Sequence, residues 1–198
     1  MRRDLVNAGI GVVVLTLLLG IAYPLLVTGV SQLAFPGNAN GQRIYVRGHL
    51  VGSKVIGQNF AGNPRYFQSR PSATLPPNNA AATTFSNLGP NSVATKKAIL
   101  ANIAAYLKLN QPYDPGLTVA KIPVDAVNNS ASGIDPQISI ANARIQAHRV
   151  AKLRGLTLAR VDALISSHTS GRGLGFSGEP GVNVLELNLA LNRIGSGA

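Results

Sequence analysis

One long uncharged segment constrains this chain more than any other feature. Residues 5–42 contain no Asp, Glu, Lys, Arg or His, and residues 8–35 are almost entirely apolar. A helix that crosses the hydrocarbon core of a bilayer needs roughly 20 apolar residues, and this run exceeds that length. Pro24 lies inside the run, where we expect it to kink a helix that neighbouring groups can still stabilise in a membrane. The sequence therefore predicts a single transmembrane anchor, marked by Ala8, Pro24 and Phe35.

The main alternative to an anchor is a cleavable signal peptide. Arg2 and Arg3 resemble the basic start of such a peptide, and Gly37-Asn38-Ala39 resembles a cleavage site made of small residues. The apolar run, however, is about twice as long as the apolar core of most signal peptides, which favours a retained helix. The tail before the run is short, and long domains translocate with little regard to their charge. We therefore expect a cytoplasmic N-terminus and a C-terminal domain outside the cytoplasm.

Three parts of the chain follow from this pattern. Residues 1–35 are the N-terminal tail and transmembrane helix, 36–42 a linker, and 43–198 an extracytoplasmic domain. At the start of this domain, residues 43–56 alternate apolar and polar side chains in two short pieces, which predicts a small β-hairpin or two short strands. Residues 63–90 are rich in Pro, Asn, Ser and Thr. An irregular stretch of that length inside a compact domain is usually functional.

Apolar residues at helical spacing predict four helices in the rest of the domain. They are 93–108 with Ser92 as its N-terminal cap, 140–154 with Ser139 as cap and Gly155 as terminator, a helix that starts at Thr157, and 182–194. The last segment also fits a strand, but Pro180 suits the first turn of a helix and favours that interpretation. The fold class is therefore α+β: a single N-terminal transmembrane helix followed by a mostly helical domain with a small β element.

The second of these helices separates apolar from basic residues. Its apolar face consists of Ile140, Ala143, Ala147 and Val150, and its basic residues are Arg144, Arg149, Lys152 and Arg154. We expect the basic residues to cover much of the remaining surface, with His148 solvated among them. His168 closes the apolar face of the following helix and is expected to be a hydrogen-bonded core histidine.

Composition excludes several classes of site. The formal net charge is +11, but the basic residues are scattered singly apart from Lys96-Lys97, with no aromatic platform between them. We therefore expect no nucleic acid partner, and the charge suits a surface near anionic lipid headgroups. The absence of cysteine excludes disulfides and thiolate metal sites. The three histidines show no metal-ligand spacing, and neither a GxSxG elbow nor a Walker loop occurs.

Five segments of the sequence, taken together and in this order, are a more specific signal than any one of them alone. They are VGSKVIGQNF (51–60), YFQSRPSAT (66–74), SNLGP (86–90), IPVDAVNNSASGIDPQIS (122–139) and LGFSGEPGVNVLELNLAL (174–191). Together with the N-terminal apolar segment they resemble the KdpC family of Kdp-type potassium-transporting ATPases over nearly the whole chain. Three positions depart from that family's pattern: Gln137 stands where a histidine is usual, Ile140 where a proline is, and Gly181 where an arginine is. No role that rests on the histidine or the arginine is carried over.

The resemblance implies a non-catalytic subunit of a high-affinity, ATP-driven potassium uptake complex in the bacterial inner membrane. It implies three protein partners: a potassium-channel-like pore subunit, a P-type ATPase subunit and a small helical subunit. Members of this family are described as needed for assembly and as catalytic chaperones that raise the ATP affinity of the ATPase subunit. The chain alone is expected to bind no cofactor. ATP shared with the ATPase subunit is the one candidate, and Gln58 is the residue that the resemblance assigns to it.

An exported domain would place Gln58 across the membrane from a cytoplasmic ATP site, so a buried turn or interface amide is the competing interpretation. Candidate interface residues are Arg70, Ser72, Asp135 and Glu179, all within the segments that carry the resemblance. Arg70 and Ser72 flank a proline and suit either a loop brace or a partner contact. The domain is a poor potassium ligand, since potassium sites use rings of carbonyl oxygens. The alternative from another class is an anchored extracytoplasmic binding protein or hydrolase.

Overall fold

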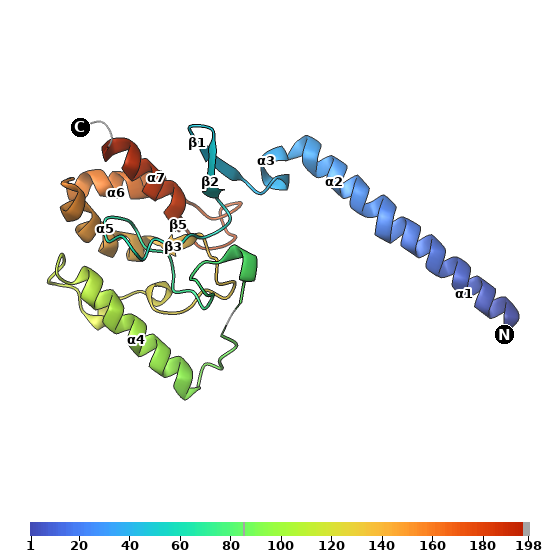
Figure 1. Ribbon diagram of the computed structural model, residues 1–198, viewed down its shortest axis with the longest axis horizontal. Helices are drawn as coiled ribbons and strands as arrows, with labels where there is room; N and C mark the ends of the chain where they lie inside the picture. The colour runs from blue at the N-terminus through green and yellow to red at the C-terminus, as the bar shows by residue number, and fades with distance from the viewer. Residues whose placement is uncertain (85, 196–198) are drawn as a thin grey trace. The chain divides into compact units, whose positions relative to one another are not determined.

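The computed structural model describes residues 1–84 and 86–195 (Figure 1). The chain divides into two compact units, Met1–Val51 and Gly52–Ala198. The fold class is α+β, with helices predominating and two small sheets in the described residues.

The first unit begins with one continuous helical segment, Arg2–Ala34. It consists of α1 (Arg2–Leu15), a π-helical stretch η1 (Thr16–Ala22) and α2 (Tyr23–Ala34). This segment is long and apolar enough to cross a membrane, and none of it is buried inside the protein. Pro24 lies in the first turn of α2, directly after the π-helical stretch. Wider i→i+5 turns accommodate a proline that lacks an N–H and crowds the preceding turn, so the irregularity has a local cause.

The rest of the first unit contains a short helix and most of the predicted hairpin, whose second strand ends just beyond the unit's limit. The helix α3 (Pro36–Ala39) forms one turn inside the predicted linker. Strands β1 (Arg43–Val46) and β2 (His49–Ser53) form a two-stranded sheet, and β2 ends three residues before the predicted limit. Arg47 and Gly48 between them both have positive φ angles, as a two-residue hairpin turn of type I′ requires.

The described residues of the second unit form four α-helices and a three-stranded sheet. The helices are α4 (Val93–Asn110), α5 (Ile140–Arg154), α6 (Leu158–Ser167) and α7 (Val184–Gly195). The strands are β3 (Gln137–Ser139), β4 (Thr169–Ser170) and β5 (Gly181–Asn183), and short 3-10 turns lie at η2 (Ala80–Ala82), η3 (Val119–Lys121) and η4 (Val124–Ala126). The helix α5 packs against α4 and α6, and α6 packs against α7.

The helix limits confirm the capping signals in the sequence. The hydroxyls of Ser92, Ser139 and Thr157 each accept a hydrogen bond from the backbone N–H three residues later. These bonds satisfy donors that the first turn leaves unpaired. Gly155 ends α5 in the left-handed conformation, with φ 68°. Because local side chains define these ends, the sequence predicted them closely.

The three-stranded sheet was not predicted. Its order is β3-β5-β4, antiparallel throughout, with Ile138 opposite Val182 and Thr169 also opposite Val182. Ile138 and Val182 are buried and join the core cluster with apolar residues of α5, α6 and α7. Strands of two or three residues are too short to show an alternating pattern. The helix predicted from residue 182 therefore begins at Val184, after a strand.

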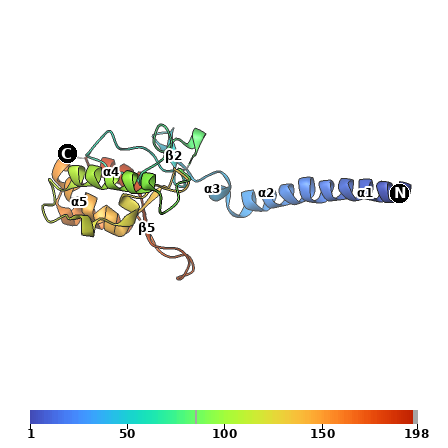
Figure 2. The ribbon, with the colours of Figure 1, turned by 90° about the horizontal axis from the view of Figure 1, so that it is seen from below.

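One prediction about α5 was wrong. Arg149, placed among the solvent-facing basic residues, is completely buried, and His148 is half-buried. Arg144 is exposed, as expected. His168 is half-buried at the end of α6, where its Nδ1 atom lies 2.9 Å from the carbonyl oxygen of Leu164. Figure 2 shows a further feature of this unit, a segment between β4 and β5 that projects away from its helices.

Candidate functional site

The candidate site is built around the irregular segment that follows Tyr66. Its backbone is held by amide side chains from two helices. The Asn188 side chain on α7 accepts a hydrogen bond from the Phe67 N–H (2.9 Å) and donates one to the Phe67 carbonyl (3.0 Å). Gln146 on α5 does the same for Gln68, accepting from its N–H (2.7 Å) and donating to its carbonyl (3.1 Å). A carboxamide has the donor and acceptor of a peptide group, so these two side chains replace the neighbouring strands of a sheet.

The buried Arg149 holds the start of the same segment. Its guanidinium donates to the carbonyl of Tyr66 (2.9 Å), the carbonyl of Pro64, Oε1 of Gln146 (2.8 Å) and Oδ1 of Asn110 (3.0 Å). All four acceptors are uncharged, and among the described residues no carboxylate forms an ion pair with it. Burial lowers the pKa of Arg149 to about 10, so the group stays charged near neutral pH. Arg149 therefore ties α4, α5 and the 64–66 loop together through hydrogen bonds alone.

Three of the four candidate interface residues lie in one cluster. The Arg70 guanidinium donates to Oδ2 of Asp135 at 2.8 Å, with both side chains part-buried. Oδ1 of Asp135 accepts from the N–H of Gln137 (3.0 Å). The Ser72 hydroxyl donates to the carbonyl of Gly133 (2.7 Å). The structure thus joins the second and fourth segments of the family resemblance, and this arrangement fits a loop brace.

Glu179 lies outside that cluster. Its two carboxylate oxygens accept hydrogen bonds from Arg172 at 2.9 and 3.0 Å. Both residues are exposed and belong to the segment between β4 and β5. The four candidate interface residues therefore do not form one continuous site.

Gln58 lies beside the cluster and packs against backbone. Its carbonyl accepts a hydrogen bond from the Ser69 hydroxyl (2.9 Å). A Cβ atom added at Gly52 would overlap Nε2 of Gln58 and would lie 2.7 Å from Cδ2 of Leu185. The half-buried Gln58 side chain therefore occupies the space that the missing side chain of Gly52 leaves. This placement suits an amide that fixes the local fold.

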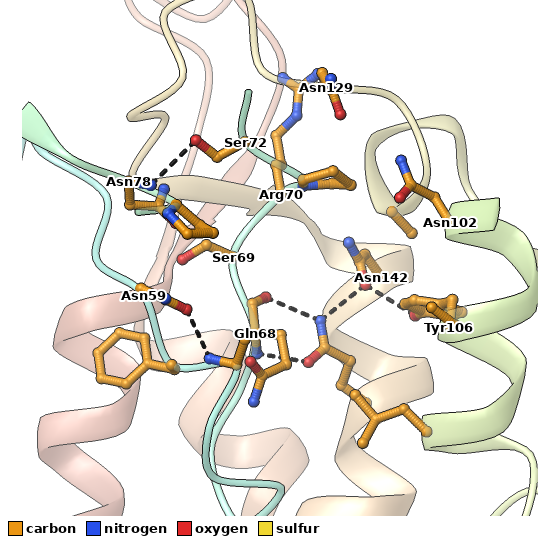
Figure 3. Close-up of a pocket in the computed structure, with 18 of the residues that line it drawn as sticks. Asn59, Gln68, Ser69, Arg70, Ser72, Asn78, Asn102, Tyr106, Asn129 and Asn142 are labelled. Atoms are coloured by element: carbon orange, nitrogen blue, oxygen red, sulfur yellow. Dashed lines mark hydrogen bonds between the residues drawn. The ribbon is translucent and has the colours of Figure 1, made fainter. Parts of the chain in front are cut away.

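A pocket of about 330 Å³ opens beside Arg70 (Figure 3). It is lined by residues 59–61, 68–72 and 77–78, by α4 through Asn102 and Tyr106, and by α5 through Asn142 and Gln146. Arg70 is the one charged side chain among these described lining residues, and amides and prolines make up much of the wall. Such a lining suits an uncharged group that both donates and accepts hydrogen bonds.

Polar atoms around this pocket are nearly all paired. The Tyr106 hydroxyl donates to Oδ1 of Asn142 (2.8 Å), and the Asn142 amide donates to Asp125 (3.0 Å). Burial, helped by the nearby Asp125 carboxylate, raises the pKa of Tyr106, so the phenol remains a neutral donor. Among buried side-chain atoms in the described residues, Gln68 Oε1 and Arg70 Nε have no hydrogen-bond partner. Both residues line the pocket, and their two unpaired atoms are buried, with almost no surface open to solvent.

Sequence reasoning missed the amides that build this site. Asn142, Gln146 and Arg149 follow Ser139 at a spacing of three or four residues and therefore share one face of α5. All three side chains are buried. A stripe of polar residues at helical spacing, directly beside an apolar stripe, was the available signal. In the described residues, no group of three or more His, Cys, Asp or Glu side chains could hold a metal ion.

Comparison with known proteins adds a second kind of information. The family of the K+-transporting ATPase c chain matches residues 5–193. A potassium-transporting ATPase KdpC subunit from Methylibium petroleiphilum is 55% identical over 179 residues, which is 90% of this chain and 91% of that protein. The KdpC subunit of Methylococcus capsulatus is 51% identical over 180 residues, 90% of this chain and 92% of that protein. That of Mycobacterium bovis BCG is 47% identical over 195 residues, 98% of this chain and 100% of that protein.

Proposed function

The chain belongs to the KdpC family, the c chain of K+-transporting ATPases, and on that premise we propose that it is an accessory subunit of a potassium-transporting ATPase. One observation carries the proposal: the likeness to KdpC subunits extends from the apolar N-terminal helix to α7. Its partners are then the other subunits of that complex: a pore subunit, a P-type ATPase subunit and a small helical subunit.

The proposed topology is a retained anchor in the bacterial inner membrane with the domain outside the cytoplasm. In this proposal, residues 1–35 are the tail and anchor, 36–42 the linker and 43–198 the extracytoplasmic domain. Support comes from the apolar helix Arg2–Ala34, none of whose residues is buried within the protein and which therefore needs lipid or another helix around it.

A fusion experiment tests this topology. Alkaline phosphatase fused after residue 198 should be active in cells, because it folds to its active form only after export. Green fluorescent protein fused at the same point should remain dark when it is exported through the Sec pathway. The opposite pair of results would place the domain in the cytoplasm and would restore direct ATP contact as an explanation of the subunit's role.

The role that the geometry supports best is non-catalytic bracing of the complex. The polar groups of the Arg70–Asp135 cluster bond chiefly to one another and to backbone. Gln58 packs against Gly52. A cluster whose polar groups bond mainly within its own domain suits a subunit that holds a partner in one conformation. The catalytic-chaperone role described for the family, in which ATP affinity of the ATPase subunit is raised, is the second candidate, and Gln58 is the residue on which it depends.

Replacing Gln58 by alanine separates these two roles. If the amide braces the domain, the change leaves a gap beside Gly52 and Leu185, and the complex should be recovered in lower yield with unchanged ATP dependence. If the amide contacts ATP, losing one hydrogen bond of about 1 kcal/mol should raise the half-saturating ATP concentration several-fold. The ATPase rate of the purified complex is measured against ATP and against potassium in separate titrations.

Asn128→Ala is the matched control for this experiment, because Asn128 is an exposed amide elsewhere in the domain. It should change neither assembly nor either titration. A several-fold rise in half-saturating ATP with Gln58→Ala, with full assembly and unchanged potassium dependence, would contradict bracing and favour the chaperone contact.

A further inference from the structure

The segment between β4 and β5 exposes two large apolar side chains. Residues 171–179 are all exposed, and Figure 2 shows this part of the chain projecting from the rest of its unit. Leu174 is 90% exposed and Phe176 is 76% exposed. Soluble surfaces commonly show single apolar residues, but two that are separated only by Gly175 at the end of a projection indicate a contact site.

The tip of this projection is a preformed tight hairpin. Gly173 and Ser177 exchange two backbone hydrogen bonds of 2.8 Å, and the Phe176 N–H donates to the Gly173 carbonyl at 3.2 Å. Leu174 and Gly175, the central residues of this turn, have φ angles of 53° and 82°. Type I′ turns require positive φ at both central positions, where glycine and asparagine are preferred. A leucine there costs conformational energy, and such strain often marks functional positions.

The stem of the hairpin has an exposed ion pair near its tip and a strand pairing at its base. Arg172 and Glu179 face one another across it through two hydrogen bonds of 2.9 and 3.0 Å. Its base continues into the antiparallel pair of β4 and β5, where Ser170 lies opposite Gly181. Backbone hydrogen bonds at the tip and strand pairing at the base therefore form the turn before any partner binds, and a preformed turn loses less entropy on binding.

We propose that this hairpin, residues 171–180, is a docking finger whose Leu174 and Phe176 side chains insert into an apolar pocket on another subunit of the potassium-transporting ATPase. The inference rests on the proposed function, since it takes the partner from that complex. Insertion would bury both side chains. Large apolar side chains buried in a well-fitting pocket commonly contribute most of the binding energy of an interface.

Charge favours a protein pocket over a lipid surface. Interfacial segments bind anionic membranes through unpaired Lys and Arg beside their apolar residues. The hairpin has one cation, Arg172, and Glu179 pairs with it, so the segment carries no net charge. A bilayer also adapts to any apolar shape, and a strained, preformed turn gives no advantage there. A pocket of fixed shape, in contrast, binds a preformed turn more tightly than a flexible one.

A pair of substitutions tests the finger. The full-length chain carrying Leu174→Asn and Phe176→Ser is co-expressed with the other subunits, and the complex is recovered through a tag on the pore subunit. Asparagine tolerates the positive φ of the turn, so only the apolar side chains are lost. We expect recovery of this chain to fall at least tenfold, while its melting temperature in detergent stays the same. Val93→Ser is the control, because Val93 is 84% exposed on α4, and it should leave recovery unchanged.

The outcomes are distinguishable. If the unchanged chain is not recovered with the other subunits, the proposed function fails. If the unchanged chain and the double variant are recovered equally well, only the docking finger is wrong. The lipid alternative is tested with Phe176→Trp in the full chain alone in liposomes, because the sequence contains no other tryptophan. Quenching of its fluorescence by brominated lipids would also overturn the proposal, whereas we expect a water-exposed emission maximum and no quenching.

Discussion

Replacing Arg149 by methionine is expected to lower the free energy of unfolding of the domain by about 3 kcal/mol. The guanidinium makes four hydrogen bonds to uncharged acceptors, among them the carbonyls of Pro64 and Tyr66. Methionine fills much of the same volume but leaves those acceptors buried without a donor, at a cost of about 1–3 kcal/mol for each that water cannot reach. Methionine carries no charge, so the free-energy cost of burying the guanidinium charge is absent in the variant. Four acceptors lose their donor, whereas the desolvation cost of only one charge is removed. We therefore expect the variant to be less stable overall.

The measurement is a urea titration of the full-length chain in detergent, followed by circular dichroism. Arg144→Met is the matched control, since Arg144 lies on the same helix and is exposed. Surface substitutions of this kind usually change stability by less than about 0.5 kcal/mol. Equal midpoints for the two variants would show that the hydrogen bonds of Arg149 add nothing beyond the cost of burying its charge.

The buried arginine also shows where sequence reasoning reached its limit. The starts of α4, α5 and α6 and the end of α5 were predicted because a capping hydroxyl or a glycine defines each of them locally. The placement of Arg149 depended on chain more than eighty residues away, the 64–66 loop. An arginine on a helix is exposed in most proteins, and no local pattern indicates that distant carbonyls will surround it.

The candidate site, too, was predicted only in part. The resemblance to a family selected Arg70, Ser72 and Asp135, and the structure brings these three together. The resemblance could not indicate that these residues bond to one another within the domain, because pairing between residues 65 positions apart leaves no periodic signal in the sequence. The short strands β3 and β5 escaped prediction for the same reason, since their pairing is long-range and each has only three residues.

Gly57→Ala is the second substitution for which we expect a large effect, a loss of about 3 kcal/mol in the free energy of unfolding. A Cβ at this position would overlap the carbonyl oxygen of Asp135 and lie 2.9 Å from its carbonyl carbon. These are backbone atoms, so no side-chain rotation relieves the overlap, and overpacking typically costs about 1–3 kcal/mol or more. The Gly57 N–H also donates to the Ile134 carbonyl at 2.7 Å, and separating the two segments would break that bond.

Gly57→Ala should also reduce assembly of the complex. Asp135 holds Arg70, so a shift of its backbone would disturb the cluster that we propose as the brace. We therefore expect Gly57→Ala to lower both the urea midpoint and the recovery of the complex. Gly62→Ala is the control, because a Cβ there meets no atom within 4 Å, and the lost flexibility of the unfolded chain should leave it as stable as the original or slightly more so. If both alanine variants unfold at the same urea concentration, residues 57 and 135 do not approach as closely as described. If Gly57→Ala lowers the midpoint but the folded variant still assembles fully, the cluster stabilises the domain and does not brace the complex.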